Sequence, residues 1–391
     1  MTTGVLGFTA GAASAGVKPG AARRDDVALI VSERACNAAG VFTTNQVIAA
    51  PCVITRRHLG RGPIRAIVAN SGNANACTGD QGEHDAVAMA EAAARRVGCD
   101  PHEIAVASTG VIGVPLPVDR IASAVASMPL ERERWSDVAR AIMTTDTKPK
   151  LVSADVVLGA GVVHLRGVAK GAGMIHPNMA TLLSFLVTDA EVAAPELQEI
   201  LEDAADESFN LISVDGDTST NDTVLLLANG ASGVTPRGAD LKMFASAVRG
   251  ACQRLAAEVL ADGEGVTKVF EVRVSGAASA EDARRAARTI STSNLVKTAI
   301  HGADPNWGRI LAAAGRSGAK VDQRRATVRI AEVVVFDAGG PRAFDGAQVR
   351  RAFEQRDITI GVDLGVGSER AHAWGTDLSA EYVRINADYT T

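Results

Sequence analysis

Short apolar runs with strand propensity alternate with amphipathic helical stretches along almost the whole chain. Runs rich in valine, isoleucine and leucine predict strands, and apolar residues spaced three and four apart predict helices. Because the two types interleave, we expect a mixed α/β or α+β fold with helices covering sheets. The predicted strands lie at 26–33, 47–55, 64–70, 104–113, 151–169, 181–190, 211–214, 223–229, 268–274, 327–337, 357–365 and 381–386. The predicted helices lie at 83–97, 118–128, 135–143, 194–207 and 239–261.

The length of the chain predicts more than one domain. A chain of 391 residues holds two to three domains at about 150 residues each. The small residues around 276–280 form a stretch that is typical of a boundary. We therefore expect a larger domain at 1–278 and a smaller α/β domain at 279–391.

Composition and charge exclude several classes of function. The net charge of −5, with only 9 Phe, 3 Trp and 2 Tyr, leaves neither a positive field nor stacking platforms for nucleic acid. No apolar run reaches the 18 residues or so that a membrane span needs. The first residues lack the basic and apolar regions of a secretory signal, so the expected location is the cytoplasm.

The cysteines predict neither a disulfide framework nor a metal site. Their number is odd, and no two stand in a CxxC pair. Such a pattern is typical of small buried apolar side chains rather than of zinc ligands. We expect no metal and no cofactor; the cysteines are Cys36, Cys52, Cys77, Cys99 and Cys252.

Three motifs resemble functional loops but have simpler interpretations. RHLGRG at 57–62 has the spacing of a loop that holds a pyrophosphate, yet Pro63 and a predicted strand follow it instead of a helix. The run 211–220 places Asp215 and Asp217 after a strand, as in magnesium-dependent phosphatases, but also reads as an Asx-rich turn. HGADPNWG at 301–308 holds one His and one Asp, too few for a metal site.

A fourth motif, KGAGMIHPNMAT at 170–181, contains a candidate nucleophile. Thr181 follows the small residue Ala180 and opens an apolar run. Left in the chain, Thr181 is simply a β-branched residue entering a strand. If the Ala180–Thr181 bond is cut, one residue carries both a hydroxyl nucleophile and a free α-amine, which can serve as its base. An ordinary α-amine has a pKa of about 7.7–8.0, suitable for that role near neutral pH.

Eight motifs together resemble the ornithine acetyltransferase family of arginine biosynthesis, in the right order and over nearly the whole chain. The resemblance implies an αββα layered sandwich, like that of N-terminal-nucleophile enzymes, with a smaller C-terminal domain. The motifs are NSGNANACTG at 70–79, STGVIG at 108–113, IMTTDTKPK at 142–150, KGAGMIHPNMAT at 170–181, SVDGDTSTND at 213–222, ADGEGVTK at 261–268, HGADPNWGR at 301–309 and YVRINADYTT at 382–391.

The same resemblance implies an activity and an assembly. The chain is expected to cut itself between Ala180 and Thr181 into fragments 1–180 and 181–391. Two copies of each fragment would form a heterotetramer. Thr181 would carry an acetyl group from N-acetylornithine to glutamate, and acetyl-CoA is a further donor that the sequence leaves open.

Specific residues carry over from the family motifs. By resemblance, Thr109 and Gly110 form the oxyanion hole, which a Gly-containing turn after a strand suits because backbone N–H groups can converge there. The substrate-binding residues implied are Thr147, Lys170, Thr181, Glu264, Asn386 and Thr391.

Other functions stay open from the residues alone. An N-terminal-nucleophile aminopeptidase would share the fold but release amino acids to water. A magnesium-dependent phosphatase would use Asp215 and Asp217 and lose activity to a chelator. A binding protein without activity would keep its chain intact.

Overall fold

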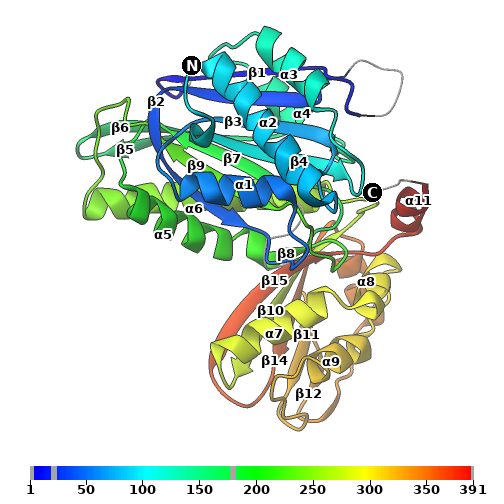
Figure 1. The fold of residues 1–391 in the computed structure, drawn as a ribbon. Coiled ribbons are helices and arrows are strands. Elements are labelled where there is room, and N and C mark those ends of the chain that lie inside the picture. Colours follow the sequence, from blue (N-terminus) through cyan, green and yellow to red (C-terminus); the bar gives the residue numbers. More distant parts are fainter. Residues whose placement is uncertain (1–3, 19–23, 177–181, 389–391) are drawn as a thin grey trace.

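The computed structural model describes residues 4–18, 24–176 and 182–388, and its strands form two sheets (Figure 1). The first contains β1 (Phe8–Ala13), β2 (Val27–Phe42), β3 (Ile64–Asn73), β4 (Ile104–Val111), β5 (Lys150–Leu158), β6 (Gly161–Lys170), β7 (Leu183–Thr188) and β9 (Thr223–Ala228). Their order is β4-β3-β2-β9-β7-β6-β5, with β1 also on β2. The second contains β8 (Ile212–Ser213), β10 (Val269–Ala277), β11 (Thr327–Ile330), β12 (Val333–Asp337), β13 (Gly340–Pro341), β14 (Asp357–Asp363) and β15 (Glu369–Thr376), in the order β13-β12-β11-β14-β10-β15-β8.

Helices cover both sheets. Those beside the first are α1 (Ala50–Leu59), α2 (Gly79–Val97), α3 (Val118–Ser127), α4 (Trp135–Ala141), α5 (Ala194–Asp206) and α6 (Ala239–Ala261). The later ones are α7 (Ala280–Ser291), α8 (Asn294–His301), α9 (Trp307–Gly315), α10 (Gly346–Phe353) and α11 (Ala380–Asp388), and short 3₁₀ turns lie at Pro101–Glu103 and Phe209–Leu211. Within the described residues, the search for a helix long and apolar enough to cross a bilayer finds none.

Strand β2 is long enough to belong to two layers at once. Its first half, Val27–Ser32, pairs with β1, and its second half, Asn37–Phe42, pairs with β9. The pairing of β2 with β3 shifts register between Val31 and Cys36. Such irregularities bend a strand, so the two halves of the first sheet can lie face to face.

The period-two alternation of the strands sends neighbouring side chains into different cores. In β7, Phe185 packs into the core between the two halves of the sheet, whereas Leu186 packs into the core beneath α5 and α6. In β3, Ile67 joins the same central core and Val68 packs under α2. Three apolar layers therefore separate helix, sheet, sheet and helix, which confirms the predicted αββα fold class.

The second sheet has its own hydrophobic core. It contacts the elements of the first sheet along β8. Strand β10 pairs in parallel with β14 and antiparallel with β15, while α7 packs on both β10 and β15. The buried Lys297 of α8 donates to the main-chain oxygens of Val214 and Thr376, each at 2.6 Å, and so ties β8 to β15. The division at 278/279 stays a prediction; β10, which precedes it, lies inside the second sheet.

Two predicted strands are helices. Residues 47–55 lead into α1, where Pro51 occupies the first turn, a position that needs no N–H donor. Cys52, Thr55 and His58 are buried along α1 with helical spacing. Residues 381–386 belong to α11, and β15 escaped the sequence analysis. Short β-branched runs are ambiguous because periodicity alone does not separate a strand from a buried helix segment.

Candidate active site

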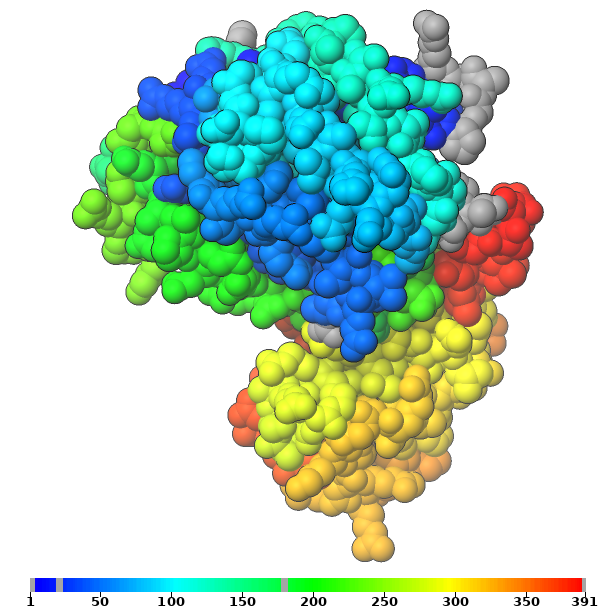
Figure 2. Space-filling model, viewed as in Figure 1, coloured from blue at the N-terminus to red at the C-terminus, as the bar shows by residue number. Residues whose placement is uncertain are grey.

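A polar pocket lies where β4 and β6 end, between the loop before β9 and helix α11. Its volume is about 110 Å³. Figure 2 shows α11, in red, on the surface beside the line where the larger and smaller parts of the molecule meet. The lining residues are Thr109, Gly110, Ile112, Thr144, Thr145, Lys170, Gly173, Met174, Asp215, Asp217, Ser219, Thr220, Asn221, Glu264, Tyr382 and Asn386.

Thr109 and Gly110 form the wall at the end of β4. The Thr109 hydroxyl accepts a hydrogen bond from Lys170 Nζ at 3.0 Å. Gly110 has a φ of 134°, and a Cβ there would overlap the main chain of Gly72 in β3. Close approach of β3 therefore requires glycine at this position. The glycine also leaves the pocket wall bare of side chain here, as main-chain oxyanion donors require.

Lys170 is 2% exposed, although it carries an amine. Burial lowers its pKa, the carboxylate of Asp146 opposes that change, and the nearby Lys150 adds to it. Burial disfavours the charged form of an amine. Lys170 is therefore a buried amine held against the Thr109 hydroxyl, and its pKa is lower than that of a solvated surface lysine.

A buried ion network stands behind Lys170. Lys150 is fully buried and donates to Asp146 Oδ1 at 2.7 Å and to Asp262 Oδ2 at 2.6 Å. Asp146 also accepts the main-chain N–H of Gly171 at 2.7 Å, immediately after Lys170. Asp262 accepts both the N–H and the hydroxyl of Thr147. The network thus fixes the start of the KGAG turn and the TTDT run relative to each other.

The pKa of Asp146 reflects this network. Burial alone would raise it, but the ammonium groups of Lys170 and Lys150 and a main-chain N–H hold it below its ordinary value. A carboxylate of this kind stabilises the fold above the pKa it has in the unfolded chain. That contribution is lost as the pH falls through its lower folded value.

We expect Lys150→Met to destabilise the protein strongly. The change leaves Asp146 and Asp262 buried without their ammonium partner, and breaking such a pair costs about 3–5 kcal/mol. Urea unfolding of the intact protein at neutral pH measures the loss. The matched control is Lys148→Met on the exposed side of the same run, which should change the unfolding free energy by less than about 0.5 kcal/mol. Equal stabilities for the two variants would contradict the network's role.

Glu264 faces the opposite wall of the pocket. Its side chain is 9% exposed, and Asn386 Nδ2 of α11 donates to Glu264 Oε2 at 2.8 Å. A Cβ at Gly173 would overlap the Glu264 carboxylate, so the second glycine of KGAG makes room for it. Helix α11 therefore presents an amide to a carboxylate that is largely shielded from solvent.

The carboxylate of Asp215 has a structural role, which the phosphatase interpretation does not predict. Its carboxylate accepts the main-chain N–H groups of Met174, at 2.5 Å, and Ile175, at 2.9 Å. Tyr382 of α11 donates to the same carboxylate at 3.3 Å. Burial raises the pKa of Asp215 to about 6. The oxygens that a phosphatase would offer to magnesium or phosphate hold the turn after Lys170 instead.

The pocket unites most of the residues predicted from sequence. Thr109, Gly110, Lys170, Glu264 and Asn386 all line it. Thr147 does not line it; its hydroxyl is bound to Asp262, and its neighbours Thr144 and Thr145 face the cavity. Ala180, Thr181 and Thr391 lie outside the described residues.

Other residues of the site were not singled out by the sequence. Asp146 and Lys150 stand in the TTDTKPK run, and Tyr382 stands one helical turn before Asn386. One aspartate and two lysines within the nine residues 142–150 would have been the signal for a buried network. Nothing in the local sequence indicates that Asp262 completes it.

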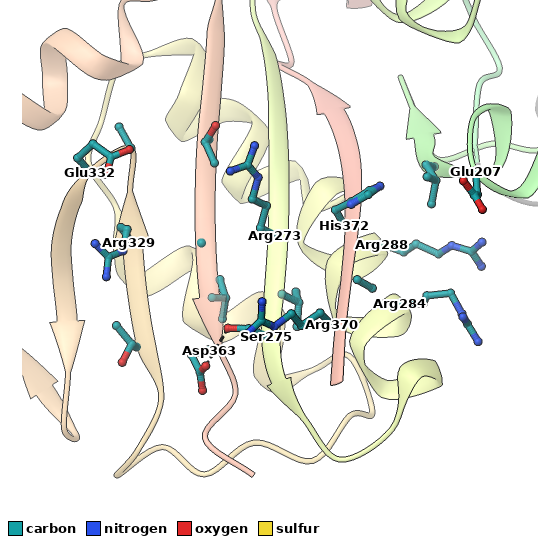
Figure 3. A pocket seen from close by; sticks show the side chains of 18 of the residues that line it. Glu207, Arg273, Ser275, Arg284, Arg288, Arg329, Glu332, Asp363, Arg370 and His372 are labelled. Atoms are coloured by element: carbon teal, nitrogen blue, oxygen red, sulfur yellow. Dashed lines mark hydrogen bonds between the residues drawn. The ribbon is translucent and has the colours of Figure 1, made fainter. Parts of the chain in front are cut away.

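A much larger cavity lies elsewhere, on the outer face of the second sheet (Figure 3). Its volume is about 1310 Å³. Arg273, Arg329 and His372 point from three strands into this cavity, and Asp363 and Glu332 lie among them. Of the residues predicted to bind substrate, none that the structure describes lines this cavity, so size alone does not mark the candidate active site.

Comparison with known proteins agrees with the resemblance drawn from the eight motifs. The arginine biosynthesis bifunctional protein ArgJ of Symbiobacterium thermophilum is 50% identical, over 100% of this chain and 98% of its own. That of Dehalococcoides mccartyi is 47% identical, over 98% and 96%. A crystal structure of the Bacillus halodurans protein of the same name is 42% identical over 51% of this chain and 96% of that chain, with a TM-score of 0.49. The family model named ArgJ matches residues 9–391, and the chain belongs to the ArgJ family.

Proposed function

We propose that this protein is a self-processing glutamate N-acetyltransferase that moves acetyl from N-acetylornithine to glutamate in arginine biosynthesis. One observation carries the proposal: Thr109, Gly110, Lys170, Glu264 and Asn386 converge on a single polar pocket. These residues come from positions up to 277 apart in the chain. Their convergence, in a member of the ArgJ family, matches an acyl-transfer site better than any of the alternatives.

The first reaction is cleavage of the chain. The Thr181 hydroxyl attacks the Ala180 carbonyl carbon, the C–N bond breaks, and an ester joins Ala180 to the Thr181 oxygen. In net terms, the hydroxyl group loses one proton and the freed nitrogen gains one. Water then hydrolyses the ester, giving the Ala180 carboxyl group and a free Thr181 hydroxyl beside a new α-amine.

The second reaction uses the same hydroxyl on substrate. The Thr181 oxygen attacks the acetyl carbonyl of N-acetylornithine, ornithine leaves, and acetyl remains on Thr181. The amine of glutamate then attacks this ester and departs as N-acetylglutamate. The α-amine of Thr181 carries the proton in both half-reactions, while Thr109 and Gly110 stabilise the tetrahedral oxygen.

Glu264 and Asn386 suit two substrates with opposite distal charges. The Glu264 carboxylate can pair with the distal ammonium of ornithine. The amide of Asn386 donates to Glu264 Oε2 and to the main-chain oxygen of Tyr382; releasing either acceptor frees an N–H for the distal carboxylate of glutamate. An amide beside a carboxylate therefore lets one pocket accept both amino acids in turn.

The proposed assembly follows from the proposed cut. Fragments 1–180 and 181–391 stay together because β6, before the cut, pairs with β7, after it. Two copies of each form a heterotetramer in the cytoplasm. The enzyme needs no bound cofactor or metal, and acetyl-CoA serves as a second acetyl donor to Thr181.

Two experiments test the proposal: denaturing electrophoresis and an acetyl-transfer assay. Denaturing electrophoresis of the purified protein should show two fragments in place of one 40.3 kDa chain. The protein should transfer acetyl from N-acetylornithine to glutamate faster than to water. Faster release to water would favour the aminopeptidase, and an uncut, inactive chain would favour a binding protein.

Deleting Tyr389–Thr391 should lower activity without affecting self-cleavage. Helix α11 brings Asn386 to the pocket, and the residues that follow include Thr391, predicted to bind substrate. Loss of one or two hydrogen bonds to a charged substrate costs about 1.5–3 kcal/mol, or roughly 10- to 100-fold in kcat/KM. Steady-state kinetics measure this loss, and Thr390→Ala at full length is the control. Full activity in the shortened protein would refute a role for the tail.

A further inference from the structure

Asp222 is a buried carboxyl group placed beside the predicted cut. It is 0% exposed and directly precedes β9, which lies parallel to β7 (Figure 1). Its Oδ1 accepts the main-chain N–H of Leu182 at 3.0 Å. Leu182 is the residue that follows Thr181, so Asp222 binds the main chain one residue after the proposed nucleophile.

The second oxygen of this carboxyl group is not used by the fold. Among the residues that the structure describes, Asp222 Oδ2 is buried and has no hydrogen-bond partner. Burial raises the pKa of Asp222 well above its ordinary value, against the opposing effects of the Leu182 N–H, Lys170 and the nearby Ser219 side chain. A neutral carboxyl group keeps its proton on one oxygen. Because Oδ1 accepts the N–H, the proton belongs on Oδ2.

Asp189, near the other end of β7, is a buried aspartate with a structural role and serves as a comparison. It is also 0% exposed, but its oxygens accept the N–H groups of Leu6 and His164 and the His164 ring Nδ1. Native structures leave few buried polar atoms unpaired, and each exception calls for an explanation. The unpaired proton donor on Asp222 therefore points to a partner in the reaction.

We propose that Asp222 is the acid that protonates the main-chain nitrogen of Thr181 when the chain cuts itself. This inference rests on the proposed self-cleavage. The nitrogen of residue 181 is three covalent bonds from Leu182 N, hence within about 4 Å of the atom that Asp222 holds. The amide nitrogen cannot leave as an anion, so breaking the C–N bond requires a proton at that atom.

The proposed step conserves atoms and charge. As the Thr181 oxygen bonds to the Ala180 carbon, the C–N bond breaks and Asp222 Oδ2 gives its proton to the nitrogen. The proton that the Thr181 hydroxyl loses returns to Asp222. The carboxyl group ends protonated, as it began, and the chain holds an ester and a free amine.

The test is the rate of self-cleavage of Asp222→Asn in the full chain. The amide keeps the shape and the acceptor for Leu182 N–H but has no acidic proton. General acid catalysis contributes about 10²–10⁴-fold, so the 40.3 kDa precursor should persist at least about 100 times longer. Cell-free synthesis followed by a chase and denaturing electrophoresis measures the rate for both proteins.

The pH dependence of the cleavage rate distinguishes a proton-donating role of Asp222 from a purely structural role. The wild-type rate should fall on the alkaline side as Asp222 loses its proton, and Asp222→Asn should lack that fall. The charged or titratable groups facing Asp222 are Lys170 from β6 and Cys52 from α1, whose thiol lies 3.8 Å from the Asp222 main-chain oxygen. Asp189→Asn, the matched buried control, should cleave at the wild-type rate with the wild-type profile.

The outcomes are distinguishable. An uncut wild-type chain would overturn the proposed function and this inference with it. A wild-type chain that is cut, with Asp222→Asn cut equally fast or slowly with an unchanged pH profile, would overturn the inference alone. If Asp222→Asn fails to fold, the wild-type protein alone still tests the inference. A wild-type cleavage rate that does not fall at high pH would refute the role of Asp222 as the acid.

Discussion

We expect Thr181→Ala to leave a single 40.3 kDa chain and to abolish acetyl transfer. Alanine has no hydroxyl group to attack the Ala180 carbonyl, so neither the free amine nor the acetyl-enzyme can form. Removal of a nucleophile that forms a covalent intermediate lowers kcat by about 10⁴-fold or more. Electrophoresis reports the cut, and transfer of labelled acetyl from N-acetylornithine to glutamate reports the chemistry.

Thr181→Ser is the matched control for this variant. Serine keeps the hydroxyl group and the α-amine after cleavage, so two fragments and measurable transfer should remain. Mass spectrometry of the large C-terminal fragment incubated with N-acetylornithine should show one added acetyl group. Processing of Thr181→Ala into the same fragments would refute the assigned nucleophile.

Lys170→Met should lower kcat/KM by about 100- to 1000-fold, the usual effect of removing one oxyanion donor or its support. The change removes the 3.0 Å hydrogen bond to the Thr109 hydroxyl. It also removes the charge of Lys170, which we expect to disfavour protonation of the Thr181 α-amine. Without that charge the amine's pKa rises, so the acidic limb of the pH–rate profile should move to higher pH.

Thr109→Val separates the two effects of Lys170. If Lys170 acts mainly through Thr109, the valine variant should lose nearly as much activity, and the double variant should lose little more than either. The valine variant leaves the charge in place, so its acidic limb should stay where it is in the wild type. An acidic limb that Lys170→Met leaves unmoved would count against the electrostatic role.

Much of the fold was predictable because it depends on local patterns. The apolar run 181–190 contains β7, and the alternation of its side chains explains how Phe185 and Leu186 enter different cores. Residues 194–207 and 239–261 have helical spacing and form α5 and α6. The errors at 47–55 and 381–386 fell on short stretches that contain β-branched residues. At 47–55, Pro51 was the better guide because proline suits the first turn of a helix.

The sequence by itself determined the family, the layered architecture and the candidate nucleophile Thr181, because motifs and hydrophobic periods are properties of consecutive residues. Only the tertiary structure decided which groups meet. Thr147 and Asp262 are 115 positions apart, and Asn386 and Glu264 are 122 apart. Which oxygen of Asp222 stays unpaired depends on packing from several elements. Burial and hydrogen-bond partners are properties of the folded surroundings, and they set the pKa and the role of each group.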